Sequence, residues 1–261
     1  MLPPDTLKAS WLEREAEYSA FVNGPLLDFW SNRDERTFQG TDDVTIRYVQ
    51  FTDPAHDKVL VISSGRSESY VKYPEVLYDF FHLGFDVFIM DHRGQGLSGR
   101  MLDDPQKGHV ERFDDYIDDF SQFTNIALAE KNYAYRYALA HSMGGAILGG
   151  YLLREPDTFR AAVLCAPMFG INLPMPMWRA DKRPSERNEY AVSTGKWQPL
   201  PFLINMLTHS YPRYRRYLRC YADYPALRLG GPTYHWLRES IDIGQKIIAQ
   251  AGEIKTPLMV L

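Results

Sequence analysis

The sequence predicts an α/β fold, in which a mostly parallel β-sheet carries helices on both faces and an inserted helical cap. Short apolar runs, which suit buried strands, alternate along the chain with longer segments of helical periodicity. This alternation is typical of parallel sheets covered on both sides. The 261 residues are enough for one large domain of this class with an insertion.

Composition and charge narrow the classes of protein that fit. Hydrophobic residues make up 45% and charged residues 24% of the chain, which is ordinary for a soluble globular protein. The formal net charge of −4 does not indicate nucleic acid as a partner. The two cysteines, Cys165 and Cys220, indicate a reducing compartment rather than a disulfide framework. The N-terminus has no signal-peptide pattern, and no apolar run approaches the roughly 20 residues of a membrane span, so we expect a cytoplasmic protein.

Residues 1–34 are expected to form an N-terminal helical arm. An amphipathic helix is predicted over 6–22, and Asn23, Gly24 and Pro25 are expected to end it. Its apolar positions share one face and are Leu7, Trp11, Tyr18 and Val22. The simplest interpretation is a helix packed on the domain, and an arm that touches a membrane is the alternative.

The core of the fold is expected over 35–167 and again over 233–261. Strands are predicted at 37–39, 44–51, 58–63, 85–90, 133–139 and 161–165, and from Thr256 onward. Helices are predicted over 71–82, from the N-cap residue Asp114, after residue 142, and through about residue 249. Four aspartates of the second of these helices are expected to form a solvated acidic stripe rather than a metal site, namely Asp114, Asp115, Asp118 and Asp119.

The segment 140–145 (AHSMGG) joins a predicted strand to a predicted helix, which is the layout of a nucleophile elbow. In such an elbow the serine has a strained backbone, and its hydroxyl projects from the sheet. The residues two before and two after it approach closely, so both must be small, as Ala140 and Gly144 are. The usual pattern has glycine in place of Ala140, and a glycine-rich turn without chemistry is the alternative. We interpret Ser142 as a nucleophile at a helix N-terminus that favours an oxyanion.

Seven motifs in this order and spacing resemble the α/β-hydrolase family. They are GPLLDFW (24–30), GRSESYVKY (65–73), FHLGFDV (81–87), DHRGQGLSG (91–99), AHSMGGA (140–146), APMFGI (166–171) and GGPTYHWLRES (230–240). The resemblance runs over essentially the whole chain, and it is to the superfamily of monoglyceride lipases and serine aminopeptidases, above all to its bacterial lysophospholipases. It implies the α/β-hydrolase fold and a serine hydrolase.

The resemblance also implies the oxyanion donors. In this fold the loop after the third strand supplies one backbone N–H, and the residue after the nucleophile supplies the other. Here the loop is 64–68 (SGRSE), so the donors are the backbone N–H groups of Arg66 and Met143. Many relatives carry His-Gly where this loop has Ser-Gly, a change that main-chain donors tolerate. An ordinary surface arginine is the alternative for Arg66. Asp91, in the glycine-rich loop after strand 85–90, is expected to hold that loop and not to be the triad acid.

The segment 168–232 differs from the rest of the chain and is interpreted as a cap or lid. It is rich in proline and aromatic residues, including the run PRYRRYLRCY at 212–221. Ten Lys and Arg residues face four acids, so its net charge is +6. A basic, aromatic lid suits an anionic lipid headgroup or a membrane surface. A solvated helical hairpin is the alternative.

A serine nucleophile needs a histidine to take its proton and a carboxylate to orient that histidine. In α/β-hydrolases the order is Ser, acid, His, and both partners follow the strand that begins at Thr256. They are therefore expected beyond Leu261, with this chain truncated before the triad acid and weakly active or inactive by itself. His141 is expected to point away from the nucleophile, whereas His209 or His235 could line the pocket.

The resemblance implies hydrolysis of carboxylic esters of single-chain lipids, in which a lysophospholipid yields a fatty acid and a glycerophospho-compound through an acyl-serine. A monoacylglycerol lipase, or a serine peptidase or small-ester hydrolase of the same superfamily, is the alternative. A catalytically inactive lipid-binding fragment is a further one. No nucleotide loop or metal motif occurs, so no cofactor and no metal are expected. The expected partners are a lipid substrate and a membrane surface. The cap is expected to touch that surface peripherally, at the inner membrane.

Overall fold

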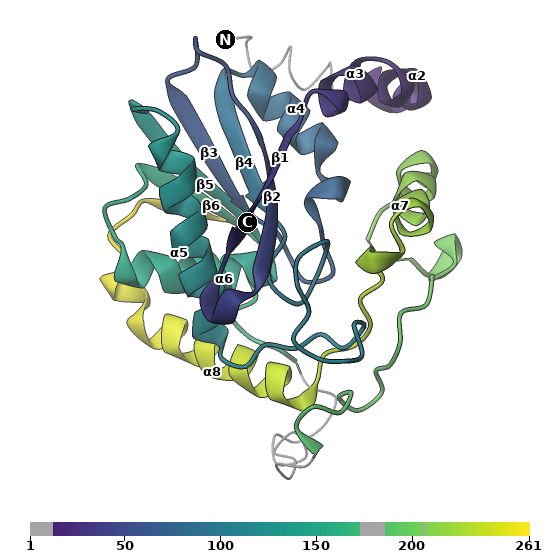
Figure 1. Cartoon of the computed structure of the whole chain (residues 1–261), viewed down its shortest axis with the longest axis vertical. Helices are drawn as coiled ribbons and strands as arrows, with labels where there is room; N and C mark the ends of the chain where they lie inside the picture. The colour runs from purple at the N-terminus through teal and green to yellow at the C-terminus, as the bar shows by residue number, and fades with distance from the viewer. Residues whose placement is uncertain (1–12, 173–185, 206) are drawn as a thin grey trace.

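Figure 1 shows the computed structural model, which describes residues 13–172, 186–205 and 207–261. Within these residues, seven strands form one sheet in the order β1-β2-β4-β3-β5-β6-β7. The strands are β1 (Asp34–Gln39), β2 (Thr45–Phe51), β3 (Lys58–Ser63), β4 (Phe85–Met90), β5 (Tyr135–His141), β6 (Ala161–Cys165) and β7 (Leu258–Val260). β1 and β4 pair antiparallel with β2, and all other pairs are parallel. The sheet is therefore mostly parallel, as the sequence predicts.

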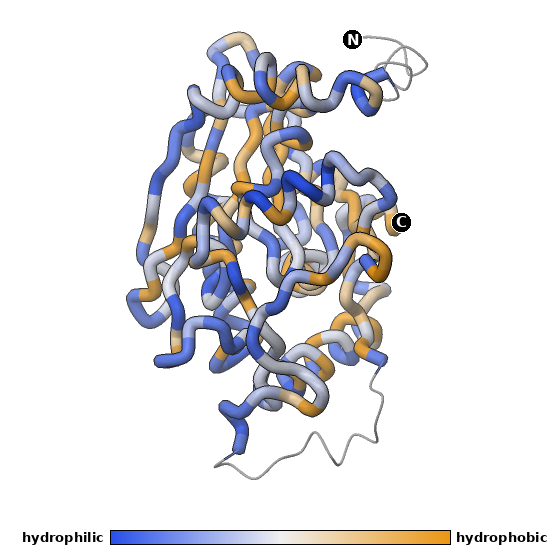
Figure 2. Tube along the Cα trace, turned by 90° about the vertical axis from the view of Figure 1, so that its right-hand side faces the viewer, coloured by the Kyte–Doolittle hydropathy of each residue, from blue (hydrophilic) through white to orange (hydrophobic). Residues whose placement is uncertain are grey.

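Helices cover both faces of the sheet (Figure 1). The α-helices are α2 (Tyr18–Asn23), α3 (Pro25–Ser31), α4 (Pro74–His82), α5 (Phe113–Ala129), α6 (Met143–Arg154), α7 (Tyr211–Asp223) and α8 (Tyr234–Gln250). Short 3-10 helices are η1 (Thr41–Asp43), η2 (Tyr70–Lys72), η5 (Phe202–Ile204), η6 (Pro225–Leu227) and η7 (Ala251–Glu253). One apolar core joins α5, α6 and α8 to the sheet, and a second joins α3, α4 and α7 to the opposite face. Figure 2 shows the hydrophobic residues following the strands through the interior.

The predicted strands 58–63, 85–90 and 161–165 are confirmed to the residue, because each is a continuous apolar run between polar or glycine-containing turns. The strand before the elbow runs two residues later than expected. In the N-terminal arm, α2 ends at Asn23 before Gly24, as expected, and a second helix that the sequence did not predict, α3, begins with Pro25 at its first position. Leu7 and Trp11 lie outside the described residues.

The aspartates of α5 do not form a solvated stripe, so that expectation is wrong for two of the four. Asp115 and Asp119 have 0% exposure. Buried Arg93 donates to Asp119 at 2.7 Å and lies 3.6 Å from Asp115, because carboxylates this deep require a cationic partner. Arg112, and not the expected aspartate, occupies the N-cap. The other two aspartates pair with Arg154 at 2.5 and 2.7 Å. Among the described residues no group of three metal-ligating side chains is placed to hold an ion.

The segment 168–232 leaves the core between β6 and α8, and its described part carries η5, α7 and η6 (Figure 1). Backbone hydrogen bonds fasten its end to a core loop: Gly108 donates to Gly231 at 3.0 Å, and Gly230 donates to Gln106 at 2.8 Å. We propose the division into an arm (1–34), a core (35–167 and 233–261) and a cap on this basis.

No helix in the parts of the chain that the structure describes is both long enough and apolar enough to span a bilayer.

The turn between β5 and α6 depends on one close backbone contact. A Cβ atom at Gly144 would overlap the carbonyl group of Ser63, the last residue of β3. Ala140, two residues before the turn, is 1% exposed. Only small residues on both sides of the turn let α6 begin directly beneath the strand ends.

We expect Gly144→Ala to destabilise the protein, because the added methyl group meets backbone of a central strand that cannot move freely. Overpacking of this kind costs about 1–3 kcal/mol, measurable by thermal or urea unfolding. Gly149→Ala, on the same helix, is the matched control, since its Cβ would meet Phe169 and Ile247 at 3.3–3.4 Å. Equal stability of the two variants would contradict the close contact at Gly144.

Candidate active site

Ser142 stands between β5 and α6 with φ 50° and ψ −117°. A positive φ is unfavourable for serine, so the surrounding structure must hold it. Its N–H donates to the carbonyl of Cys165 at 3.0 Å, and its carbonyl accepts from Gly145 and Met168 at 2.9 Å each. Three backbone hydrogen bonds therefore fix the strained residue between two strand ends, in the backbone conformation expected of a nucleophile elbow.

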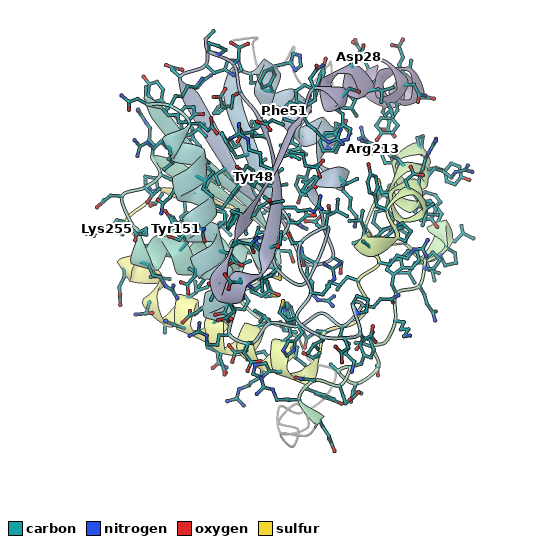
Figure 3. The ribbon with its side chains drawn as sticks, in the orientation of Figure 1. Asp28, Tyr48, Phe51, Tyr151, Arg213 and Lys255 are labelled. Atoms are coloured by element: carbon teal, nitrogen blue, oxygen red, sulfur yellow. The ribbon has the colours of Figure 1, made fainter. Side chains whose placement is uncertain are left out.

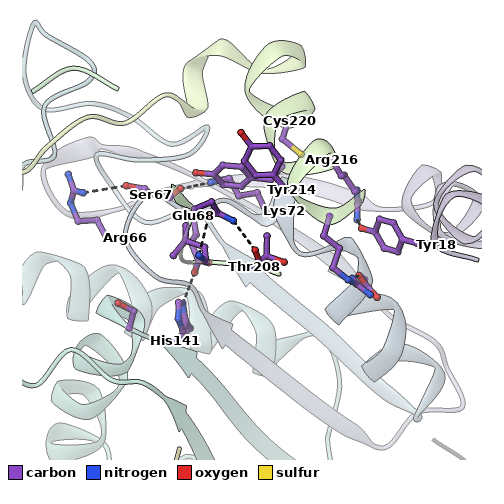
Figure 4. Close-up of a pocket in the computed structure, with 16 residues that line it drawn as sticks. Tyr18, Arg66, Ser67, Glu68, Lys72, His141, Thr208, Tyr214, Arg216 and Cys220 are labelled. Atoms are coloured by element: carbon purple, nitrogen blue, oxygen red, sulfur yellow. Dashed lines mark hydrogen bonds and ion pairs between the residues drawn. The ribbon is translucent and has the colours of Figure 1, made fainter. Parts of the chain in front are cut away.

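Ser142 lines a cavity of about 560 Å³ (Figure 4). The elbow and the loop after β3 contribute to one side of it, and α7 of the cap contributes to the other. Tyr18 of α2 closes the far end. Ser142 and Arg66 were predicted from separate parts of the sequence to contribute to catalysis, and both line this cavity. The cavity is large enough for part of a lipid ester.

The two predicted oxyanion donors have free backbone amides. Among the described residues, no backbone carbonyl accepts from the N–H of Arg66 or Met143. Met143 is the first residue of α6, and buried amides without partners are rare in folded proteins. Two such amides beside a strained serine suit the binding of a developing oxyanion.

The side chain of Arg66 is not an ordinary surface group, so that alternative is wrong. Its guanidinium donates to the carbonyl of Gly230 at 2.5 Å and lies 5.3 Å from the ring centroid of Trp236. Burial lowers the pKa of Arg66 to about 10. Arg66 lines the cavity, and its side chain anchors the loop to the base of the cap.

Glu68 is a site residue that the sequence reasoning missed. Its Oε2 accepts from the N–H of Gly65 at 2.5 Å and from the hydroxyl of Tyr73 at 2.6 Å, and it lies 3.1 Å from Nδ1 of His141. A Cβ at Gly65 would come within 2.8 Å of both the Glu68 carboxylate and the His141 imidazole, so a larger residue there would displace this pair. The acidic residue three positions after the loop glycine, within the GRSESYVKY motif, was the available sequence signal.

His141 lines the same cavity as Ser142, contrary to the expectation that it points away. The hydrogen bond that His141 donates to Glu68 raises the pKa of His141 above its usual value, despite burial that acts in the opposite direction. Burial raises the pKa of Glu68, but hydrogen bonds from His141, Tyr73 and the backbone outweigh it, and the net pKa is lowered. The two side chains form an ion pair at the cavity wall (Figure 4).

Asp91 holds the loop region, as expected. It is fully buried and accepts from the hydroxyl of Ser69 at 2.8 Å and from the backbone N–H groups of Tyr70 and Leu97 at 2.7 Å each. Burial raises the pKa of Asp91 to about 6. Its acceptor sites are occupied by the loops after β3 and β4, which it ties together.

The histidines considered as alternatives do not reach the cavity. His209 is exposed, and His235 makes a 2.7 Å hydrogen bond with the carbonyl of Glu111 on the exposed side of α8. Neither belongs to the cavity lining. The prediction that the triad acid and histidine follow β7 stays a prediction.

We expect Glu68→Gln to lower the pKa of His141 toward the ordinary value of 6.5, because the carboxylate that favours the imidazolium is removed. A histidine NMR titration of the wild type and the variant measures this shift. Since the folded-state pKa is raised, the pair stabilises the wild type below about pH 6.5 and loses that contribution as the pH rises through the raised value. An unchanged His141 pKa in the variant would contradict the ion pair, and His82, away from the cavity, serves as the internal control.

Relatives support this picture. The chain is 53% identical over 258 residues to lysophospholipase L2 of Escherichia coli strain K12, covering 96% of this chain and 76% of the relative. It is 31% identical to a probable lysophospholipase L2 of Haemophilus influenzae, with 95% and 81% covered. It is 27% identical to a monoacylglycerol lipase of Mycolicibacterium smegmatis, with 88% and 78% covered.

Solved structures show the same fold. A thermostable carboxyl esterase from Bacillus coagulans matches with a TM-score of 0.65 at 15% identity, over 87% of this chain and 78% of the esterase. A monoglyceride lipase from Saccharomyces cerevisiae matches with a TM-score of 0.64 at 16% identity, over 87% and 75%. The family model of the serine aminopeptidases, S33, matches residues 54–261. The chain therefore belongs to the S33 serine aminopeptidase family of α/β-hydrolases.

Proposed function

We propose that this protein is a serine hydrolase that cleaves the carboxylic ester of single-chain lipids, with a lysophospholipid as substrate and a fatty acid and a glycerophospho-compound as products. The strained backbone of Ser142 at the wall of the cavity carries the proposal. The relatives named lysophospholipase L2 support the substrate class.

In the proposed reaction the hydroxyl oxygen of Ser142 attacks the ester carbonyl. The N–H groups of Arg66 and Met143 stabilise the oxyanion, the bond to the glycerol oxygen breaks, and that oxygen leaves with a proton as the alcohol. Water then attacks the acyl-serine and releases the fatty acid. A histidine base is needed to move these protons, and His141 of the described chain lies with its Nδ1 3.1 Å from Glu68.

Monoacylglycerol lipase activity is the second candidate. It is favoured by the 27% identity to the monoacylglycerol lipase of Mycolicibacterium smegmatis. The same acyl-serine chemistry serves either substrate, and only the headgroup differs. Cleavage of aminoacyl arylamides in place of lipids would instead indicate a peptidase.

We expect Ser142→Ala to lower kcat by at least about 10⁴-fold, since loss of a serine nucleophile leaves only the oxyanion site and binding. The substrates are lysophosphatidylcholine and 1-monoacylglycerol with the same acyl chain, and an aminoacyl arylamide. A fluorophosphonate probe is expected to label the wild type at Ser142 only. Ser31→Ala, at an exposed serine of α3, is the control. The assays use the full-length protein, in which the triad acid and histidine are expected. Undiminished hydrolysis by the Ser142 variant would refute the proposal, and absence of any hydrolysis by the unsubstituted full-length protein would favour a lipid-binding role.

We also propose that the protein is cytoplasmic and touches the inner membrane peripherally through its cap. Both cysteines are free, as in a reducing compartment. Five large apolar side chains around η5 are exposed, namely Leu200 (55%), Leu203 (95%), Ile204 (61%), Leu207 (80%) and Tyr211 (52%). Leu207 also lines the cavity, so this apolar patch is continuous with it. A lipid surface suits such a patch because it covers apolar side chains and delivers the substrate.

We expect the double variant Leu203→Ser and Leu207→Ser to bind vesicles of zwitterionic and anionic phospholipid at least about 10-fold more weakly, because two leucines no longer enter the lipid. Sedimentation with vesicles measures the partitioning. Leu27→Ser, at a leucine of α3 that is 53% exposed but outside the cap, is the matched control. Equal partitioning of the double variant and the wild type would argue against this contact surface.

A further inference from the structure

Besides Arg66, three cations line the cavity, two of them on α7. Arg213 and Arg216 lie on the face of this helix that lines the cavity, and Lys72 of η2 lies opposite them. Figure 4 shows Arg216 beside Tyr18, and Lys72 nearer to Ser67. These cations differ sharply in what neutralises them, and that difference decides which of them can bind a ligand.

Arg213 is already neutralised. Its Nε lies 2.9 Å from Glu15, its Nη1 binds Glu75, and its guanidinium lies 4.4 Å from the ring centroid of Tyr18. Figure 3 shows Arg213 between α7 and the N-terminal helices. Two carboxylates compensate one guanidinium, so Arg213 serves to join the cap to α4 and the arm.

Arg216, one turn further along the same face, has no such compensation. Its hydrogen bond is to the hydroxyl of Tyr18, at 3.4 Å from Nη1. In the described part of the chain no carboxylate lies within 4 Å of its guanidinium. The side chain is partly buried and lines the cavity. A half-buried guanidinium held by a neutral hydroxyl keeps most of its five donors available for an anion.

Lys72 is also held only by neutral groups. Its Nζ donates to the carbonyl of Ser67 at 2.6 Å and to the hydroxyl of Tyr221 at 2.5 Å, and it lies 4.8 Å from the ring of Tyr217. Burial lowers the pKa of Lys72 to about 8, although the nearby charge of Glu68 acts in the opposite direction. An anion beside it would restore the charged form. Through Ser67, Lys72 contacts the loop that carries Arg66, and it shares the cavity lining with Ser142 and Arg216.

We propose that Arg216, assisted by Lys72, binds the phosphodiester of a lysophospholipid headgroup while the ester lies at Ser142. This inference rests on the proposed function, and it deepens it by naming the residues that distinguish a lysophospholipid from a monoacylglycerol. A phosphodiester carries one negative charge and two free oxygens, which match the guanidinium fork. A monoacylglycerol has a neutral hydroxyl at the same place, so it gains nothing from Arg216.

The test compares Arg216→Gln with the wild type on lysophosphatidylcholine and on 1-monoacylglycerol with the same acyl chain. We expect kcat/KM for the lysophospholipid to fall by about 10- to 100-fold, as for loss of a charge-assisted hydrogen bond. The value for the monoacylglycerol is expected to stay within about twofold. Arg216→Lys is expected to restore part of the preference, because it keeps the charge but not the fork.

Arg219→Gln is the matched control. Arg219 is on the same helix, its side chain is 80% exposed, and it pairs with Asp223 at 3.5 Å. The Arg219→Gln substitution removes one positive charge from the cap, as Arg216→Gln does, but that charge does not line the cavity. An equal loss for both variants would mean that general attraction to the lipid surface explains the effect, and it would overturn the headgroup site. Circular dichroism melting of each variant shows that the fold is kept.

Failure of this inference is distinguishable from failure of the proposed function. If the wild type cleaves both lipids and Arg216→Gln changes both equally, the headgroup site is wrong and the hydrolase stands. If the full-length protein, with the triad acid and histidine present, cleaves neither, the proposed function itself is wrong. Competition separates a headgroup from free phosphate: glycerophosphocholine is expected to inhibit monoacylglycerol cleavage at lower concentration than inorganic phosphate, and only when Arg216 is present. Stronger inhibition by inorganic phosphate would overturn the assignment to a headgroup.

Discussion

The contact between the backbone of Gly144 and the end of β3 is the constraint on which the site depends. It lets α6 start beneath a central strand, so the chain must turn within one residue. That residue is Ser142, and its positive φ is the consequence. Such strain costs about 1–3 kcal/mol and persists only where the surroundings over-determine it. Backbone hydrogen bonds from Ser142 to Cys165 and from Met168 to Ser142 hold the strained conformation in place.

The loop after β3 is positioned by groups from three directions. Glu68 binds the N–H of Gly65 and reaches His141 on the elbow. Gln95, from the loop after β4, donates to the carbonyl of Gly65 at 2.8 Å. The side chain of Arg66 reaches the base of the cap at Gly230. Displacement of either the elbow or the cap base would therefore be transmitted to the amide proposed to bind the oxyanion.

Sequence patterns predicted the parts of this structure that local chemistry determines. Buried strands are continuous apolar runs, and the elbow needs small residues at fixed offsets, so both could be identified without tertiary contacts. The partners of charged groups could not. Asp119 is assigned to a solvent face by helical periodicity, but Arg93, 26 residues away, compensates it in the interior. The direction of His141 likewise depends on Glu68, 73 residues earlier in the chain.

The sequence also does not show which charges of the cap are paired. Its net charge of +6 counts residues and does not say where unpaired charge lies. Pairing divides that sum: Glu15 and Glu75 compensate Arg213, whereas Arg216 meets a neutral hydroxyl. Of these two arginines, the one without a carboxylate partner is therefore Arg216, which lines the cavity. A localised charge inside a low-dielectric cavity discriminates between ligands, while a diffuse surface charge is screened within about 8–10 Å. Under these proposals, adhesion to a bilayer depends on the exposed leucines around η5. Selection of a headgroup depends on Arg216.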